Sequence, residues 1–142
     1  MKTLTGIMAV TIFLIVTGAN LIGERNVKNA TAPSSEDGVS LYKRHCLSCH
    51  QADGSGVPSL YPGLNGNERV VGEAKPLIEV ILLGSKGPFS VDKDKYMGAM
   101  ASYKFLSDED IANVLTYIRT HFTNDAGTIS AGQVKEVRSS IE

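Results

Sequence analysis

The sequence predicts an all-α protein, and three observations lead to this class. Apolar residues recur at helical spacing around residues 38–46 and 107–123, and a third apolar stretch lies at 76–83. No segment carries a strong strand pattern. The stretches between these segments are rich in glycine and proline, which favour loops. With 142 residues, the chain has room for one small domain and an appendage.

The chain begins with an apolar segment that is typical of export. Lys2 is followed by the uncharged stretch Leu4–Val16 and then by the small residues Thr17–Ala19. This order predicts a secretory signal peptide over residues 1–19. The alternative is an uncleaved N-terminal anchor, because the uncharged stretch Leu4–Ile22 is just long enough to span a bilayer. Either reading places the domain outside the cytoplasm.

Residues 20–36 are expected to form a flexible linker, because small and polar residues dominate and no apolar periodicity occurs. The first helix is predicted to begin near Ser35–Asp37, where Ser or Asp can cap it and acidic side chains suit its positive end. From Gly38 onward, apolar residues at helical spacing lead to Cys46, which this helix should present to the next feature of the chain.

The most specific motif is Cys46-Leu47-Ser48-Cys49-His50, which has the C-x-x-C-H pattern of a c-type haem attachment site. Each thiol can add to one haem vinyl group, and the histidine is then held under the iron. A thioredoxin-like pair would need alternating strands and helices, and a zinc site would need about four ligands. A disulfide would leave His50 unexplained. Because the chain has no other cysteines, the motif predicts one covalently bound haem c with its iron.

Residues 51–71 are expected to form a long loop with turns at Asp53-Gly54, Pro62-Gly63 and Asn65-Gly66. So long a loop indicates that it packs on something, and a haem face would explain it. A second helix is predicted over Pro76–Leu83, where the apolar content predicts near-complete burial and Gly84 ends the helix.

Residues 85–103 are predicted to be irregular and are followed by the clearest helix, Ser107–Thr123. Ser107 and the three acids after it predict a capping box. The apolar stripe of this helix consists of Ile111, Val114, Leu115, Ile118 and Phe122. Residues 124–142 are expected to form a C-terminal tail with a short helix over Ala131–Ser139.

This order of elements resembles that of the bacterial class I monohaem c-type cytochromes. The anchors are Gly38-x-x-x-Tyr42, the haem motif, Pro62-Gly63-Leu64, Tyr96–Met100 and Leu106–Arg119. The resemblance implies that residues 37–123 form a cytochrome c domain with the small cytochrome c fold, in which helices and long loops wrap around one covalently bound haem. It also implies that the first and last helices cross, with Gly38 allowing the approach and Tyr117 or Leu115 packing on it. The alternative is that Gly38 merely belongs to an N-terminal turn.

The resemblance further implies two axial iron ligands, His50 and a methionine from the loop before the final helix. Family members often read Tyr-x-Gly-x-Met-Pro in this loop, which aligns Met100 with the ligand. Ala101 stands where proline is common. Met97 is the alternative ligand.

Three further contacts follow from the resemblance or from residue type. The carbonyl of Pro62 is expected to accept a hydrogen bond from His50, which would orient the ring. Arg69 or Tyr61 is a candidate partner for a haem propionate. His121, near the end of the final helix, is expected to lie at the surface, where the helix dipole favours it.

An iron with both axial positions filled by protein has no open position for a substrate, and no second constellation in the sequence supports catalysis. We therefore expect an electron-transfer protein that carries one electron, not an enzyme. The cofactor-binding residues are Cys46, Cys49, His50 and Met100, of which His50 and Met100 are the metal ligands. One alternative is a haem subunit of a larger periplasmic oxidoreductase. The other is a five-coordinate ligand-binding or peroxidatic haem protein.

The partners are expected to be a redox donor and acceptor, such as a membrane oxidase or a periplasmic dehydrogenase or reductase. The formal charge of −1 and the lack of a Lys/Arg run argue against nucleic acid. Export predicts a periplasmic location, with membrane attachment only if the N-terminal segment is uncleaved. The loop that carries Met97 and Met100, here called the methionine loop, is flanked by four lysines. They form either a basic docking collar or a mixed-charge surface: Lys86, Lys93, Lys95 and Lys104.

Overall fold

The computed structural model describes residues 36–91 and 94–142. The signal peptide or anchor expected over 1–19, and nearly all of the linker expected over 20–36, lie outside these residues. The described elements follow in this order: α1 (Gly38–His45), α2 (Leu47–His50), α3 (Glu68–Val71), α4 (Ala74–Leu83), β1 (Phe89–Val91), β2 (Asp94–Tyr96), α5 (Asp108–Thr120) and α6 (Ala131–Ile141). Within 36–91 and 94–142, no helix is both long and apolar enough to cross a membrane.

The first helix begins where its capping signals predict. The Asp37 side chain accepts a hydrogen bond from the Ser40 amide at 3.0 Å, so it satisfies one of the free N–H groups at the start of α1. The helix ends at His45, and Cys46 forms the joint between α1 and α2. Both cysteines of the motif are therefore held by short helical turns.

The helix predicted over Ser107–Thr123 is present as α5 (Asp108–Thr120) and is therefore shorter than expected. Of the predicted capping box, only the bond accepted by the Ser107 side chain forms. Ser107 caps it through the Asp110 amide at 3.0 Å. The Asp110 carboxylate instead accepts the Glu36 amide at 2.9 Å, so it ties the start of the domain to α5. The helix ends at Thr120 because Phe122 and Thr123 have left-handed backbone angles that no helix can continue.

The sequence analysis did not predict the short helix α3 or the hairpin of strands β1 and β2. The four-residue helix α3 lies in the segment expected to be loop, and its cap is the Asn67 side chain, which accepts the Arg69 amide at 2.9 Å. Strands β1 and β2 form an antiparallel hairpin in which Phe89 pairs with Tyr96. Three residues per strand and four in the helix are too few to show a period.

Helix α4 confirms the predicted second helix but corrects its expected burial. Leu77, Ile78, Ile81 and Leu82 are buried, whereas Leu83 is 63% exposed. The helix buries one face against the core, and Leu83 falls on the opposite side at its last turn. The prediction of near-complete burial was therefore wrong for this end of the helix.

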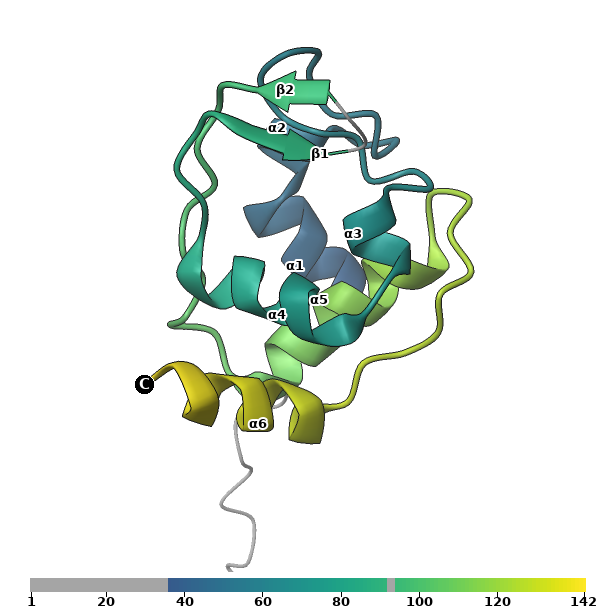
Figure 1. Ribbon diagram of the computed structural model, residues 1–142. Helices are drawn as coiled ribbons and strands as arrows, with labels where there is room; N and C mark the ends of the chain where they lie inside the picture. The colour runs from purple at the N-terminus through teal and green to yellow at the C-terminus, as the bar shows by residue number, and fades with distance from the viewer. Residues whose placement is uncertain (1–35, 92–93) are drawn as a thin grey trace, which may run out of the picture. The chain divides into compact units, whose positions relative to one another are not determined.

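Helices α1 and α5 cross in close contact, as the resemblance implies (Figure 1). A Cβ atom on Gly38 would lie 2.3 Å from the Asn113 carbonyl oxygen and 2.8 Å from the Tyr117 Cβ. Only glycine fits such a contact between two helix backbones. The crossing, and not a simple turn, explains Gly38, and Tyr117 rather than Leu115 packs on it.

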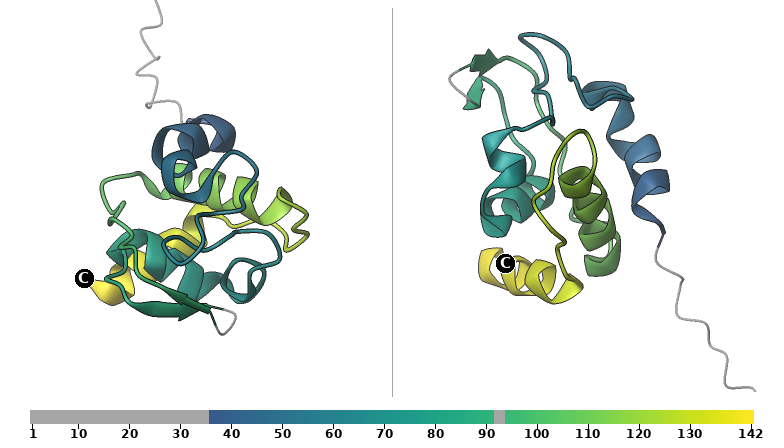
Figure 2. Two further views of the ribbon diagram at one scale, coloured as in Figure 1. Left: turned by 90° about the horizontal axis from the view of Figure 1, so that it is seen from above. Right: turned by 90° about the vertical axis from the view of Figure 1, so that its right-hand side faces the viewer.

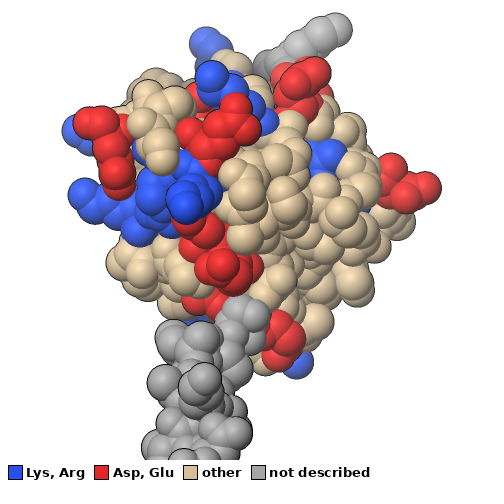
Figure 3. Space-filling view, turned by 90° about the horizontal axis from the view of Figure 1, so that it is seen from below, with Lys and Arg blue, Asp and Glu red and all other residues tan. Residues whose placement is uncertain are grey.

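The tail folds back as α6, over slightly more residues than the helix expected at 131–139. Val134 and Val137 are buried, and α6 packs against α4 and α5 at the end of the domain away from the β hairpin (Figures 1 and 2). Seen from that end, Lys/Arg and Asp/Glu side chains are interspersed instead of being sorted by sign (Figure 3).

Candidate haem-binding site

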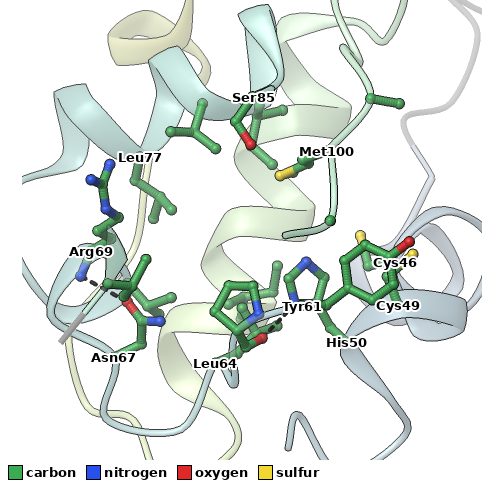
Figure 4. Close-up of a pocket in the computed structure, with 18 of the residues that line it drawn as sticks. Cys46, Cys49, His50, Tyr61, Leu64, Asn67, Arg69, Leu77, Ser85 and Met100 are labelled. Carbon is green, nitrogen blue, oxygen red and sulfur yellow. Dashed lines mark hydrogen bonds between the residues drawn. The ribbon is translucent and has the colours of Figure 1, made fainter. Parts of the chain in front are cut away.

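A cavity of about 260 Å³ lies within the domain. Its walls come from α2, the loop after it, α4, β1, the methionine loop and α5, so segments far apart in the sequence meet around it (Figure 4). Most of the lining is apolar. The aliphatic side chains on its wall include Leu64, Val70, Leu77, Ile81, Leu115 and Ile118.

Both cysteines lie at one end of this cavity. The thiols of Cys46 and Cys49 are free and lie side by side at its edge (Figure 4). Burial, and then the proximity of Cys49, raises the pKa of the Cys46 thiol to about 12. A thiol kept protonated in this way is a poor redox nucleophile. Bonding as a thioether, which carries no ionisable proton, suits this environment.

His50 is held in one tautomer by the loop that follows it. Its Nδ1 lies 3.0 Å from the Pro62 carbonyl oxygen, as predicted. Because a carbonyl can only accept, Nδ1 carries the hydrogen and Nε2 keeps its lone pair. Burial lowers the pKa of His50, and the bond to Pro62 opposes that shift without cancelling it. The ring is thus a neutral imidazole, the form that binds metals.

The two candidate methionines differ clearly in position. Met100 lines the cavity, and its sulfur and the His50 ring face each other across it (Figure 4). Two backbone hydrogen bonds of 2.9 Å join Met100 to Ser85. Met97 is 62% exposed, and its amide donates to the Ser59 carbonyl. The geometry therefore favours Met100 over Met97.

The polar side chains of the cavity wall include Asn67 and Arg69, which lie at the end away from the cysteines (Figure 4). Tyr61 also lines the wall, so both side chains predicted for a propionate border the cavity. The sequence analysis did not predict that Asn67 lines the cavity. It is buried and donates to the Gly63 carbonyl at 2.7 Å while capping α3, and its place just before Glu68 was the available signal.

The sequence did not predict the roles of two further residues near the site, Tyr103 and Arg119. The Tyr103 hydroxyl donates to the His45 carbonyl at 2.7 Å, so it links the methionine loop to the end of α1 beside Cys46. Arg119 is buried and donates to the carbonyls of Val70, Ala126 and their neighbours. Its position four residues after Leu115, beside the apolar stripe, was the only hint that it is buried.

The remaining histidines do not compete with His50 for the cavity centre. His121 is exposed at the end of α5, where its Nδ1 lies 2.9 Å from the Tyr117 carbonyl oxygen. His45 is partly exposed at the cavity rim and packs edge-on against Tyr103.

These residues fit a covalently bound haem. The vinyl groups and the propionates occupy opposite edges of a haem, and the cavity has two thiols at one end and polar side chains at the other. Its walls are apolar, as a macrocycle requires. A neutral imidazole and a thioether face each other between them, and both are ligands that iron accepts in cytochromes.

Comparison with known proteins identifies the family. Residues 35–122 match the family model described as Cytochrome c. A protein named Cytochrome c-552 from Thermus thermophilus is 36% identical over 118 residues, which cover 76% of this chain and 78% of that protein. The fructose dehydrogenase cytochrome subunit of Gluconobacter japonicus is 37% identical over 118 residues. The cytochrome c subunit of the alcohol dehydrogenase (quinone) of Gluconacetobacter polyoxogenes is 34% identical over 122 residues.

The two groups of relatives differ in length. The matched region covers 24% of the fructose dehydrogenase subunit and 25% of the alcohol dehydrogenase subunit. The chain therefore spans about a quarter of the dehydrogenase subunits that it matches, and most of the length of the Thermus protein.

Proposed function

The chain belongs to the cytochrome c family, and from this premise we propose that it is an exported one-electron carrier whose haem iron is held between His50 and Met100. Membership of the family means a covalently attached haem c. When bound, this group supplies an iron centre that gains or loses a single electron. The residues of the chain attach the group, set its potential and close its two axial positions.

One observation carries the proposal: His50 and Met100 face each other across an apolar cavity that has both motif cysteines at its edge. Cys46 and Cys49 attach the cofactor through two thioethers. Pro62 fixes the His50 ring with Nε2 free. Met100 supplies a soft thioether that favours ferrous iron and so raises the reduction potential. With both axial positions closed, the protein transfers electrons and does not transform a substrate.

A second candidate function rests on the relatives named as dehydrogenase cytochrome subunits. We propose it as the alternative that the chain serves as the haem module of a larger oxidoreductase. In both cases its partners are redox proteins, and the apolar segment after Lys2 supports a periplasmic location. Co-purification of the tagged chain with a large catalytic subunit would favour the module over the free carrier.

The ligand assignment is tested by optical spectroscopy of the exported, matured protein. A ferric iron bound to methionine has a weak long-wavelength charge-transfer band. We expect this band in the unchanged protein and in Met97→Ala, and its loss in Met100→Ala. Met97→Ala is a matched control because the two residues share one loop. Loss of the band in Met97→Ala alone would refute Met100 as the ligand.

A further inference from the structure

The segment Met100–Leu106, here called the ligand loop, joins Met100 to α5. Its first half is fastened to the end of α4. Met100 and Ser85 exchange two backbone bonds, the Ser102 hydroxyl donates to the Leu82 carbonyl at 2.5 Å, and the Tyr103 amide donates to the Ile81 carbonyl at 2.9 Å. A movement that carries the Met100 backbone away from the cavity must break this set.

The second half of the ligand loop depends on a residue from the tail. Arg138 of α6 donates to the Lys104 carbonyl at 2.8 Å and to the Leu106 carbonyl at 2.9 Å. Its Nε also pairs with the Asp108 carboxylate at 2.8 Å, in the first turn of α5. A guanidinium is a rigid fork, so these three bonds fix one orientation of the chain between the loop and α5.

The apolar contacts of this half are partial. Phe105 is 69% exposed, although its ring contacts those of His45 and Tyr103. Leu106 is partly buried against the core. The other hydrogen bonds described for residues 104–106 join them to Ser102 and Tyr103 of the same loop, and such bonds move with the loop. Within the described part of the chain, Arg138 is thus the main polar link from residues 104–106 to another element.

Helix α6 is a firm base for this link. Val134 is fully buried and Val137 nearly so, and Ser130 and Gln133 form a complete capping box at the start of the helix. The helix packs on both α4 and α5. The Arg138 side chain is only 20% exposed and that of Asp108 23%, so water screens their pairing less than it would on an open surface.

From this arrangement we propose that Arg138 is a positioning residue for the iron ligand: it holds the ligand loop closed and so limits how readily Met100 leaves the iron. The inference rests on the proposed function, because it takes Met100 as the axial ligand. It gives the C-terminal tail a part in the chemistry of the site, since Arg138 joins α6 to the loop that carries Met100.

Imidazole binding to the ferric protein tests this directly, because imidazole occupies the iron only when Met100 has left it. The Arg138→Gln substitution keeps some packing but removes the charge and the fork. Hydrogen bonds to charged groups contribute enough that we expect the apparent imidazole affinity to rise about ten-fold or more. Arg138→Lys keeps the charge without the fork and should lie between the two. An unchanged imidazole affinity in Arg138→Gln would overturn the proposal.

Two control variants separate positioning from general stability. Arg44→Gln removes an ion pair of 2.8 Å with Glu36, in which the Arg44 side chain is 64% exposed and makes no bond to the ligand loop, and should leave imidazole affinity unchanged. Asn113→Ala removes a 3.0 Å bond to the Glu36 carbonyl and should lower the unfolding temperature without raising imidazole affinity. If Asn113→Ala raises the affinity as much as Arg138→Gln does, the effect is general destabilisation and the proposal is wrong.

The same experiment distinguishes this inference from the proposed function. If Met100 is not the ligand, Met100→Ala leaves the optical spectrum of the unchanged protein as it was and binds imidazole no more tightly than that protein does. If Met100 is the ligand and Arg138 has no positioning role, the band is present and Arg138→Gln binds imidazole as weakly as the unchanged protein.

Discussion

A single hydrogen bond decides which nitrogen of His50 faces the cavity. The Pro62 carbonyl accepts a hydrogen bond from Nδ1–H, so Nε2 keeps the lone pair that can bind a metal. Because the acceptor belongs to the backbone, the bond depends on the course of the loop and not on a side chain. Gly56 permits that course, because a Cβ there would lie 2.4–2.5 Å from the carbonyl oxygens of Tyr61 and Pro62.

Tyr42 provides a prediction about pH. Its hydroxyl donates to the Gln51 carbonyl at 2.6 Å, and burial raises the pKa of this tyrosine well above its usual value near 10. The unfolded chain therefore loses this proton at lower pH than the folded chain does. Stability from Tyr42 is fully present below about pH 10 and falls above it, by about 1.4 kcal/mol per pH unit for one proton.

The check is denaturant unfolding of the ferrous protein from pH 8 to 11. Tyr42→Phe should be less stable than the unchanged protein at pH 8, because the Gln51 carbonyl loses its donor. It should also show a shallower decline above pH 10. Parallel curves for the two proteins would contradict this account of Tyr42.

Among single residues, the sequence predicts the haem-attachment motif better than it predicts the residues that position the ligands. The haem motif predicts Cys46, Cys49 and His50 directly, because their chemistry needs that spacing. Residue type alone cannot separate Met100 from Met97, since both lie in one irregular loop. The resemblance to the family favours Met100, and the folded loop shows that Met100 lines the cavity whereas Met97 is exposed. The role of Arg138 could not be predicted either, because two of its partners are backbone carbonyls that any residue carries and the third, Asp108, lies 30 residues away in the chain.

Among the elements, the crossing of α1 and α5 fixes the position of the haem motif. We predict that Gly38→Ala destabilises the protein by about 1–3 kcal/mol, because the new Cβ would overlap the Asn113 carbonyl. Gly132→Ala in α6 is the matched control. A Cβ there has its nearest neighbour at 3.8 Å, so helix propensity should make this variant neutral or more stable by up to about 1 kcal/mol. Equal effects of the two substitutions in denaturant unfolding would refute the crossing argument.

The longer helices could be predicted from the sequence because capping residues and an apolar stripe mark them. Helix α5 ends about one turn earlier than predicted, because Phe122 and Thr123 have left-handed backbone angles. The apolar pattern, which continues to Phe122, does not reveal these angles. The β hairpin and α3 were missed because they are short and are stabilised by neighbours, as when Arg69 donates to the Ser90 carbonyl at 3.4 Å. The position of α6 depends on which apolar face α4 and α5 leave uncovered.

For the whole molecule, the cofactor should be part of the core. Most of the cavity wall is apolar, and a domain of this size has only a modest core of its own. A cofactor that covers these side chains therefore supplies much of the packing. We predict that the Cys46→Ala, Cys49→Ala double variant, isolated free of haem, loses its cooperative unfolding transition. A haem-free protein that unfolds as sharply as the holoprotein would show that the chain packs without the cofactor.

The central claim, a closed six-coordinate haem that carries one electron, is tested most directly by a redox titration of the exported protein with and without carbon monoxide. We predict a reversible one-electron transition and no carbon monoxide adduct at neutral pH, whereas Met100→Ala binds the gas. Binding of carbon monoxide by the unchanged reduced protein would contradict the account, because it would reveal an open iron suited to ligand binding instead of electron transfer.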